Sequence, residues 1–299
     1  MDSLEDLRNK LESATDIHSV VSTMKAVAAS NIGQYEQAAI ALEDYYLTIS
    51  LGLAAYFKTE ELVVIPPSKE LKKNNNHKVC IIVFGSDQGL VGHFNDTLKD
   101  FTITSLEQIK GEKEIWAVGE RIEMILKDSE LKINQVFNVP NSVNVITLLI
   151  SDILIKAQEI IDHSELAEFY IVHNQPSIGI NYLPVLGKLL PLDEEWSHKF
   201  SKIKWPTTKI PEIVGDREAT LKSLIREYLF VSLFKACAES LQSENTNRLA
   251  AMKRADKNIE ELLQDLNRDY NRQRQSSIDE ELFDVVAGFE ALKNFKGSK

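Results

Sequence analysis

The chain has 299 residues, a formal net charge of −11 and a hydrophobic fraction of 43%. This composition excludes disorder along the whole length and disfavours nucleic-acid binding through a general basic field. Two cysteines, Cys80 and Cys237, are too few for a disulfide framework or a four-ligand zinc site. No run approaches the ~20 consecutive apolar residues of a membrane span, and the acidic start is unlike a signal or transit peptide. We therefore expect a reduced, intracellular globular chain.

Residues 1–65 are predicted to form one long helix. No proline precedes Pro66, and a proline inside a helix costs about 3 kcal/mol or more. Apolar residues recur every three or four positions, which is coiled-coil spacing with one interruption near Ala28. The members of this stripe are Leu4, Leu7, Leu11, Ala14, Ile17, Val21, Met24, Ala28, Ile32, Tyr35, Ala39, Leu42, Tyr46 and Ile49.

Residues 66–215 contain all eight prolines and have a different rhythm. Short apolar runs alternate with helical patterns, which predicts a Rossmann-like α/β domain with a mostly parallel sheet. The polar residues 72–77 and the proline-containing residues 201–215 are expected to connect this domain to the helices on either side. The predicted strands are 78–84, 115–118, 133–137, 169–173 and 182–192, and the predicted helices are 94–110, 120–127 and 143–162.

Residues 216–299 are predicted to form a second long helix, from 216 to about 292. Its apolar stripe fades at residues 242–248 and again at 271–277. A single helix of this length cannot bury its own stripe, so it must pack against another element. The two long helices flank the α/β domain in the chain, which predicts that they form an antiparallel coiled coil.

The segment Gly85–Asn95 (GSDQGLVGHFN) follows a predicted strand and precedes a predicted helix. Ligands bind at such places in α/β folds. However, the segment lacks the Lys-Ser/Thr ending of a phosphate-binding loop, and its glycines do not have G-x-G-x-x-G spacing. We interpret it as a tight connection with Asn95 or Asp96 near the helix cap. No cofactor site is predicted.

The remaining polar residues do not predict a catalytic or metal site. None of the six histidines are spaced like a metal-binding pair, and no acidic or cysteine cluster joins them along the sequence. Asp87 and His93 could form an acid–base pair, but a polar surface loop explains them more simply. Cys80 and Cys237 are interpreted as small buried hydrophobic residues.

Three arginines, Arg268, Arg272 and Arg274, cluster where the apolar stripe of the C-terminal helix fades. Charged residues on a helix usually form a solvated face. A guanidinium group could instead make a bidentate pair with a carboxylate of a partner protein. The sequence leaves these two interpretations open.

Three segments resemble the gamma subunit of F-type ATP synthases. They are Met24–Ser30 (MKAVAAS), Gly85–Gly92 (GSDQGLVG) and, most specifically, Asp265–Leu282 (DLNRDYNRQRQSSIDEEL). The resemblance covers both helical arms and the α/β domain, in the same order and spacing as in the family.

The resemblance implies that the two helices form the central shaft inside a catalytic head of alpha and beta subunits. The α/β domain is then expected at the foot, against the epsilon subunit and the membrane rotor ring. Rotation would change the relative free energies of the catalytic sites through differential contacts. No catalytic residue, metal, cofactor or nucleic acid is expected, and the complex would lie at the cytoplasmic face of a prokaryotic membrane.

The family's shaft-to-head contacts fall by motif position on Arg248, Gln275 and Glu281, with Arg274 beside them. Met24 matches a methionine of the opposite helix that belongs to the coupling region. Asp279 stands where the family often has threonine, so a carboxylate replaces a hydroxyl contact there. The two polar breaks at 242–248 and 271–277 fit this assignment.

Two other functions remain to be weighed against a rotor. One is a nucleotide-dependent enzyme that uses the α/β domain and has the helices as a stalk; the lack of a phosphate-binding motif argues against it. The other is a static coiled-coil scaffold. A scaffold predicts that the regions of Arg248 and Gln275 can be changed without loss of coupling between ATP turnover and pumping.

Overall fold

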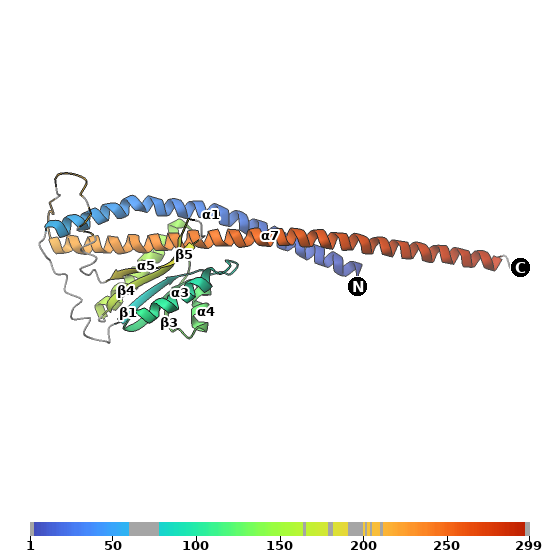
Figure 1. The fold of residues 1–299 in the computed structure, drawn as a ribbon, viewed down its shortest axis with the longest axis horizontal. Coiled ribbons are helices and arrows are strands. Elements are labelled where there is room, and N and C mark those ends of the chain that lie inside the picture. Colours follow the sequence, from blue (N-terminus) through green and yellow to red (C-terminus); the bar gives the residue numbers. More distant parts are fainter. Residues whose placement is uncertain are drawn as a thin grey trace. The chain divides into compact units, whose positions relative to one another are not determined.

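A computed structural model of the chain describes residues 3–59, 78–163, 166–178, 182–190, 200, 202–203, 205–209 and 212–296. Within the described residues every predicted strand and helix is confirmed, and only their ends differ. Residues 60–65 of the predicted helix 1–65, the predicted connection 72–77 and the last two residues of the predicted strand 182–192 lie outside the described residues. The elements are α1 (Leu4–Thr59), β1 (Lys78–Phe84), α3 (Phe94–Gln108), β2 (Glu112–Val118), α4 (Glu120–Asp128), β3 (Ile133–Phe137), α5 (Val143–His163), β4 (Leu166–Pro176), β5 (Tyr182–Leu190) and α7 (Arg217–Lys296) (Figure 1).

The chain divides into two compact units. The sheet unit comprises residues 28–248, and the helical unit comprises residues 1–27 and 249–299. Helices α1 and α7 are each divided between the two units.

The sheet unit contains a five-stranded sheet with the strand order β3-β2-β1-β4-β5. The first four strands are parallel, and β5 pairs antiparallel with β4 at one edge. Parallel neighbours need a crossover connection, and α3, α4 and α5 supply these crossovers along the chain. The expected Rossmann-like α/β domain with a mostly parallel sheet is therefore confirmed.

Helices cover both faces of this sheet, so strand β1 is buried on both sides. Val79, Ile81 and Val83 face the layer formed by α3 and α4. Cys80 and Ile82 face the opposite layer, which contains α5 and part of α7. This double burial explains why β1 is a continuous apolar run rather than an alternating one.

The parts of α1 and α7 in the sheet unit lie antiparallel to each other. Asn31 of α1 donates to Asn245 of α7 at 3.4 Å, and Tyr45 donates to Glu227 at 2.7 Å. The Tyr46 and Tyr228 rings are 5.9 Å apart. Residue 31 of α1 thus pairs near residue 245 of α7, and residues 45 and 46 pair near residues 227 and 228, which confirms the predicted antiparallel pairing.

The buried edge of α1 repeats every seven residues without interruption. One set of positions is buried at Leu7, Ala14, Val21, Ala28 and Tyr35. A second set is half-buried, and its members are Leu4, Leu11, His18, Lys25, Ile32, Ala39 and Tyr46.

The predicted stripe on α1 is therefore wrong at Ile17, which is 55% exposed, whereas the adjacent His18 is half-buried. Met24 is half-buried as the stripe requires, but the seven-residue repeat also places Lys25, which the stripe left out, at a half-buried position of the seam between α1 and α7. The interruption near Ala28 disappears once these two polar residues are placed in the seam. A pattern read from apolar residues alone skipped them.

Helix α1 contains a stretch that is apolar enough to cross a membrane by length and composition. Polar residues interrupt this stretch, so the criterion of consecutive apolar residues did not detect it. One such helix near the N-terminus is weak evidence for a membrane span, since core helices pass the same test. Ile49, Leu53 and Ala54 of α1 are buried in packing within the chain.

Candidate functional site

The glycine-containing loop between β1 and α3 is held by hydrogen bonds to its own residues. The Ser86 backbone N–H donates to Asn95 Oδ1 at 3.2 Å, and Asn95 Nδ2 donates to Ser86 Oγ at 2.8 Å. Helix α3 begins after His93, which makes no side-chain cap bond. Asn95 and Asp96 lie in the first turn of α3, near the cap as expected. The Asn95 side chain, however, binds the preceding loop at Ser86.

Asp87 occupies the N-terminus of helix α4. Its Oδ1 accepts the Glu120 N–H at 3.0 Å, and its Oδ2 accepts the Val139 N–H at 3.1 Å. A helix N-terminus is a common place for a phosphate, because its N–H groups are unpaired. Here a carboxylate of the chain already lies there. His93 is exposed and lies 3.8 Å from Asp96, so the geometry gives Asp87 a structural role rather than one in acid–base chemistry.

The glycines of this region serve close packing. A Cβ added at Gly85 would lie 2.3 Å from the Cβ of Ile122 on α4. A Cβ added at Gly119 would lie 2.5 Å from the Ser86 carbonyl oxygen, and Gly119 has a φ of +120°. The absence of side chains lets the loop, the end of β2 and helix α4 approach one another.

The polar stretch of α7 from residue 239 to residue 247 packs against this loop. Ser240 Oγ donates to the Phe84 carbonyl at 3.0 Å, and the Asn247 side-chain amide donates to the Val91 carbonyl. The first polar break of the predicted stripe is thus buried inside the sheet unit. The buried polar residues of the whole stretch are Glu239, Ser240, Ser243, Glu244, Asn245 and Asn247, of which Glu239 and Ser240 precede the predicted break at 242–248.

The pKa values of two buried carboxylates in this stretch are shifted in opposite directions. Burial raises the pKa of Glu244 to about 6, although the neighbouring Arg248 opposes that shift. Burial also disfavours ionisation of Glu239, but hydrogen bonds and charges from His173 and other neighbours outweigh it and lower the pKa. The His173 Nε2 atom lies 2.8 Å from Glu239 Oε2. Glu239 thus links α7 to strand β4 as a charged group.

Arg248, a predicted contact with the catalytic head, is engaged within the chain. Its Nη2 atom donates to Glu244 Oε1 at 2.6 Å, and the two side chains are only 15% and 5% exposed. Its Nε atom and Glu244 Oε2 are buried without a partner among the described residues. The polar break at 242–248 is explained by these internal contacts, so it does not by itself indicate a partner surface.

The second polar break lies in the helical unit and is exposed. Arg274, Gln275, Asp279 and Glu281 are exposed on α7, whereas Met24 of α1 is half-buried. The roles assigned to these five residues and to Arg248 remain predictions.

Two of the three clustered arginines pair within their own helix. Arg268 lies 3.2 Å from Asp265, and Arg272 lies 3.5 Å from Asp269. Exposed pairs of this kind contribute little to stability. Within the described part of α7, Arg274 has no ion-pair partner. Large apolar side chains are exposed beside it, namely those of Ile278, Leu282, Phe283, Val285 and Val286.

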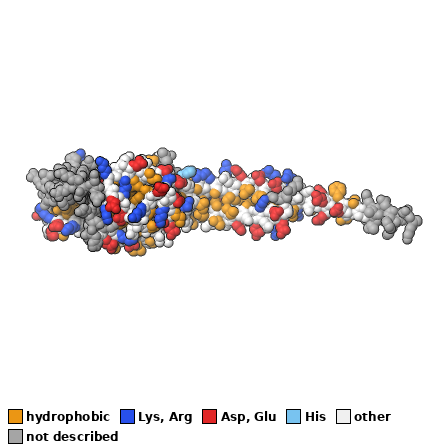
Figure 2. Space-filling model, turned by 90° about the horizontal axis from the view of Figure 1, so that it is seen from below, with side chains coloured by type: hydrophobic (Ala, Val, Ile, Leu, Met, Phe, Trp, Pro, Cys, Tyr) orange, Lys and Arg blue, Asp and Glu red, His pale blue; other side chains and the backbone are white. Residues whose placement is uncertain are grey.

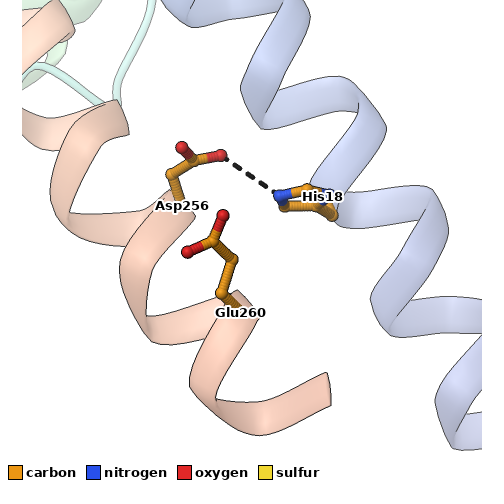
Figure 3. A group of neighbouring side chains, drawn as sticks. All are labelled: His18, Asp256 and Glu260. Carbon is orange, nitrogen blue, oxygen red and sulfur yellow. Dashed lines mark ion pairs between the residues drawn. The ribbon is translucent and has the colours of Figure 1, made fainter. Parts of the chain in front are cut away.

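The sequence suggested that no acidic cluster joins any histidine. In the structure, however, His18 has two acidic neighbours. Figure 3 shows His18 of α1 facing Asp256 and Glu260 of α7. Their possible ligand atoms all lie within 4.8 Å of one another. Sequence spacing missed this group because the antiparallel packing of the two helices brings together residues from opposite ends of the chain.

Both cysteines are buried and free, which confirms their interpretation as small hydrophobic residues. Burial is the main cause that raises the pKa of the Cys80 and Cys237 thiols. The thiolate is the reactive form, so neither thiol is set up for chemistry at neutral pH.

Comparisons with known proteins agree with this architecture. The family model described as ATP synthase matches residues 3–292. The ATP synthase gamma chain of Anaeromyxobacter sp. (strain K) is 28% identical over 300 residues, which cover 98% of this chain and 100% of that protein.

Two solved structures share the fold. One is a chain of the Euglena gracilis mitochondrial ATP synthase rotor, with a TM-score of 0.59, 16% identity and coverage of 92% and 98% of the two chains. The other comes from the central stalk and c-ring of Tetrahymena thermophila mitochondrial ATP synthase, with a TM-score of 0.56, 17% identity and coverage of 79% and 99%. Because the family match spans nearly the whole chain, this protein belongs to the ATP synthase gamma-chain family.

Proposed function

We propose that this chain is the central-stalk rotor subunit of an ATP synthase. It couples ion flow through a membrane ring to ATP synthesis or hydrolysis in a catalytic head, by rotation. The observation that carries the proposal is the family match over residues 3–292. The fold supports it, because chains from the rotor and the central stalk of two mitochondrial ATP synthases share this fold.

The subunit is non-catalytic and acts mechanically. A rotor can favour one state of a catalytic site over another only by making different contacts with the two states. The exposed polar side chains of α7 supply groups for such contacts, and Arg274, Gln275 and Glu281 are the residues proposed to make them. Charge-assisted hydrogen bonds to loops of alpha and beta subunits are the proposed chemistry.

In this proposal, different parts of the chain contact different partners. Residues 1–65 and 216–299 form the shaft helices that contact the alpha and beta subunits. Residues 66–215 form the foot domain that contacts the epsilon subunit and the membrane ring. We propose that the complex lies at the cytoplasmic face of a prokaryotic membrane and that this chain is a peripheral component of it.

Surface charge supports protein partners rather than nucleic acid. The formal net charge is −11. On the face drawn in Figure 2, acidic and basic side chains of the described residues are interspersed, and hydrophobic side chains gather along the helices. Binding to a phosphate backbone requires a concentrated basic surface, whereas mixed charges beside apolar groups suit contacts with other proteins.

The structure gives no support to a nucleotide-dependent enzyme. The Asp87 carboxylate accepts hydrogen bonds at the α4 N-terminus, and the loop itself is closed by the Ser86–Asn95 bonds. A phosphate would have to displace these groups and would meet a negative charge.

The first test is recovery of the complex. The tagged chain is purified from native membranes in mild detergent, and the retained proteins are identified by mass. We expect alpha, beta and epsilon subunits together with ATPase activity. Recovery of the chain alone from a soluble fraction would overturn the proposal.

A second test separates a rotor from a static scaffold. Because both native thiols are buried, an Asp128→Cys variant can be labelled selectively at the exposed end of α4. With the catalytic head immobilised, ATP is expected to turn a bead attached at this position. Binding of the same subunits without rotation would favour a scaffold.

A further inference from the structure

A polar layer interrupts the seam between α1 and α7 in the helical unit. His18 and Lys25 occupy consecutive half-buried seam positions of α1, where the preceding members of the series are leucines. Asp256 is half-buried on α7 and meets both of them. Polar residues at seam positions of a coiled coil lower its stability, and they are often retained because they serve a second role, such as fixing the register of the helices.

The side chains of this layer converge from two helices. His18 Nε2 lies 3.3 Å from Asp256 Oδ1. Glu260 is one helical turn beyond Asp256 on the same face, and its carboxylate points into the same space (Figure 3). Asp256 Oδ2 pairs with Lys25, and Ser22 Oγ donates to Asp256 Oδ1 at 3.3 Å.

We propose that His18, Asp256 and Glu260 bind one divalent transition-metal ion of the zinc class, which links α1 to α7. The site is independent of the proposed rotor function. Each residue supplies one ligand atom, and water completes the coordination. A bound ion would hold the two helices in one register at this layer.

The spacing of the ligand atoms suits such an ion. Two ligands bound to tetrahedral Zn²⁺ at about 2.0–2.1 Å lie about 3.3 Å apart. His18 Nε2 and Asp256 Oδ1 already have this separation. Glu260 must close a gap of at most about 1.5 Å relative to the 4.8 Å limit of the group, which rotation of an exposed side chain can supply.

Burial and charge favour a bound cation. The His18 and Asp256 side chains are 33% and 15% exposed, so water competes less here than at the surface. Glu260 is exposed and gives the ion a path from solvent. In the described region Glu260 has no ion-pair partner, so two carboxylates face one ammonium group, that of Lys25.

Lys25 selects the class of ion. Its ammonium group pairs with the Asp256 carboxylate from the side away from His18, through Oδ2, and leaves Oδ1 facing His18. The same positive charge repels cations that bind by charge alone. Mg²⁺ and Ca²⁺ prefer sites made only of oxygen ligands, whereas Zn²⁺, Co²⁺ and Ni²⁺ gain from imidazole.

The test measures metal binding to the full chain after treatment with a chelator. Zn²⁺ is titrated by calorimetry, and Co²⁺ by the visible absorption that appears when it enters a low-symmetry site. We expect one ion per chain. His18→Gln and Glu260→Gln should each weaken binding by at least about tenfold, since even residues behind the ligands change affinity by about 10–100-fold.

A matched control is His93→Gln. His93 also has an acidic neighbour, Asp96 at 3.8 Å, but it is not part of the group in Figure 3. This variant should bind both ions like the wild type. Equal losses in the His93 and His18 variants would show weak surface binding and would overturn the proposal.

A third variant moves affinity in the opposite direction. Lys25→Met removes the competing ammonium group while keeping a long side chain, so Zn²⁺ binding should tighten several-fold. Helicity and the unfolding midpoint are measured for every variant, and Zn²⁺ should raise the midpoint of the wild type only where it binds. The exposed Glu260 variant is expected to fold normally and therefore decides the outcome. Absence of saturable binding by the wild type, or unchanged binding by Glu260→Gln, would overturn the site.

Discussion

Helix α7 contains two polar segments that look alike in sequence but differ in surroundings. In the sheet unit, residues 239–248 carry mainly buried polar groups that bind the loop after β1 and strand β4. In the helical unit, residues 271–281 are mostly exposed. Both segments interrupt the apolar stripe, yet only the second presents its polar groups to solvent.

The difference shows what a polar break in a helix stripe means. Buried polar groups are stable only when they are hydrogen-bonded, and the first segment finds most of its partners within the chain. The second segment has side chains that the described chain leaves available for another protein. Mutations in the two segments should therefore act on different properties.

Breaking the buried pair should have the largest effect on stability. Arg248→Ala leaves the Glu244 carboxylate buried without its cation, and loss of one partner of a buried pair costs about 3–5 kcal/mol. Unfolding in urea measures the change. Lys222→Ala is the control, because its pair with Glu218 has side chains that are 74% and 75% exposed and should contribute little to stability. Equal losses in the two variants would contradict the buried role of Arg248.

Stability should also depend on the titration of Glu244. Its pKa in the folded state is about 6, above the ordinary value of 4.5, so the folded state binds this proton more tightly than the unfolded state. The resulting stabilisation is fully present below pH 4.5 and is lost as the pH rises through 6. The loss should be about 2 kcal/mol, at about 1.4 kcal/mol per pKa unit.

The pH dependence is isolated by comparing variants. Unfolding free energies are measured at pH 4.5 and pH 7 for the wild type and Glu244→Gln. The wild type should lose about 2 kcal/mol more than this variant over that range. Gln275→Leu in the exposed segment changes no titratable group and should behave like the wild type. An identical pH response in the Glu244 variant would rule out this assignment.

In the loop between β1 and α3, which packs against residues 239–248, replacing one glycine by alanine should lower stability and replacing another should not. Gly85→Ala places a Cβ 2.3 Å from Ile122, and overpacking of a core costs about 1–3 kcal/mol. Gly89→Ala meets no atom within 4 Å and should change the unfolding free energy by less than about 1 kcal/mol. Thermal unfolding of both variants checks this contrast, which fails if Gly89→Ala is the more destabilising.

Changes in the exposed segment should have the smallest effect on stability but should affect coupling. Gln275→Leu and Glu281→Ala should alter the unfolding free energy by less than about 0.5 kcal/mol. If these residues contact the catalytic head, protons pumped per ATP should fall several-fold in vesicles that contain the assembled complex. Normal pumping would remove Gln275 and Glu281 from the proposed contacts.

The arrangement of elements was largely predictable from the sequence. Prolines confined to residues 66–215 left both ends free for long helices. The run at residues 78–84 predicted the central strand, because a strand covered on both faces needs apolar residues throughout. These signals are local, since secondary structure reflects the spacing of residues near one another in the chain.

Seam positions were less predictable than the helices themselves. The apolar pattern chose Ile17, whereas packing uses His18. A polar residue in a seam cannot be recognised from one helix, because its partner lies on another. Lys25 meets Asp256 across 231 positions of sequence.

The sequence by itself determined the two long helices, the parallel sheet and the family to which the chain belongs. Only the tertiary structure decided which polar groups are satisfied inside the chain. Asn247 reaches the Val91 carbonyl across 156 positions, and no local pattern specifies such a pair. The physical reason is that residue spacing along the chain sets helices and strands, whereas burial and hydrogen bonding of a polar side chain depend on distant segments that folding brings to it.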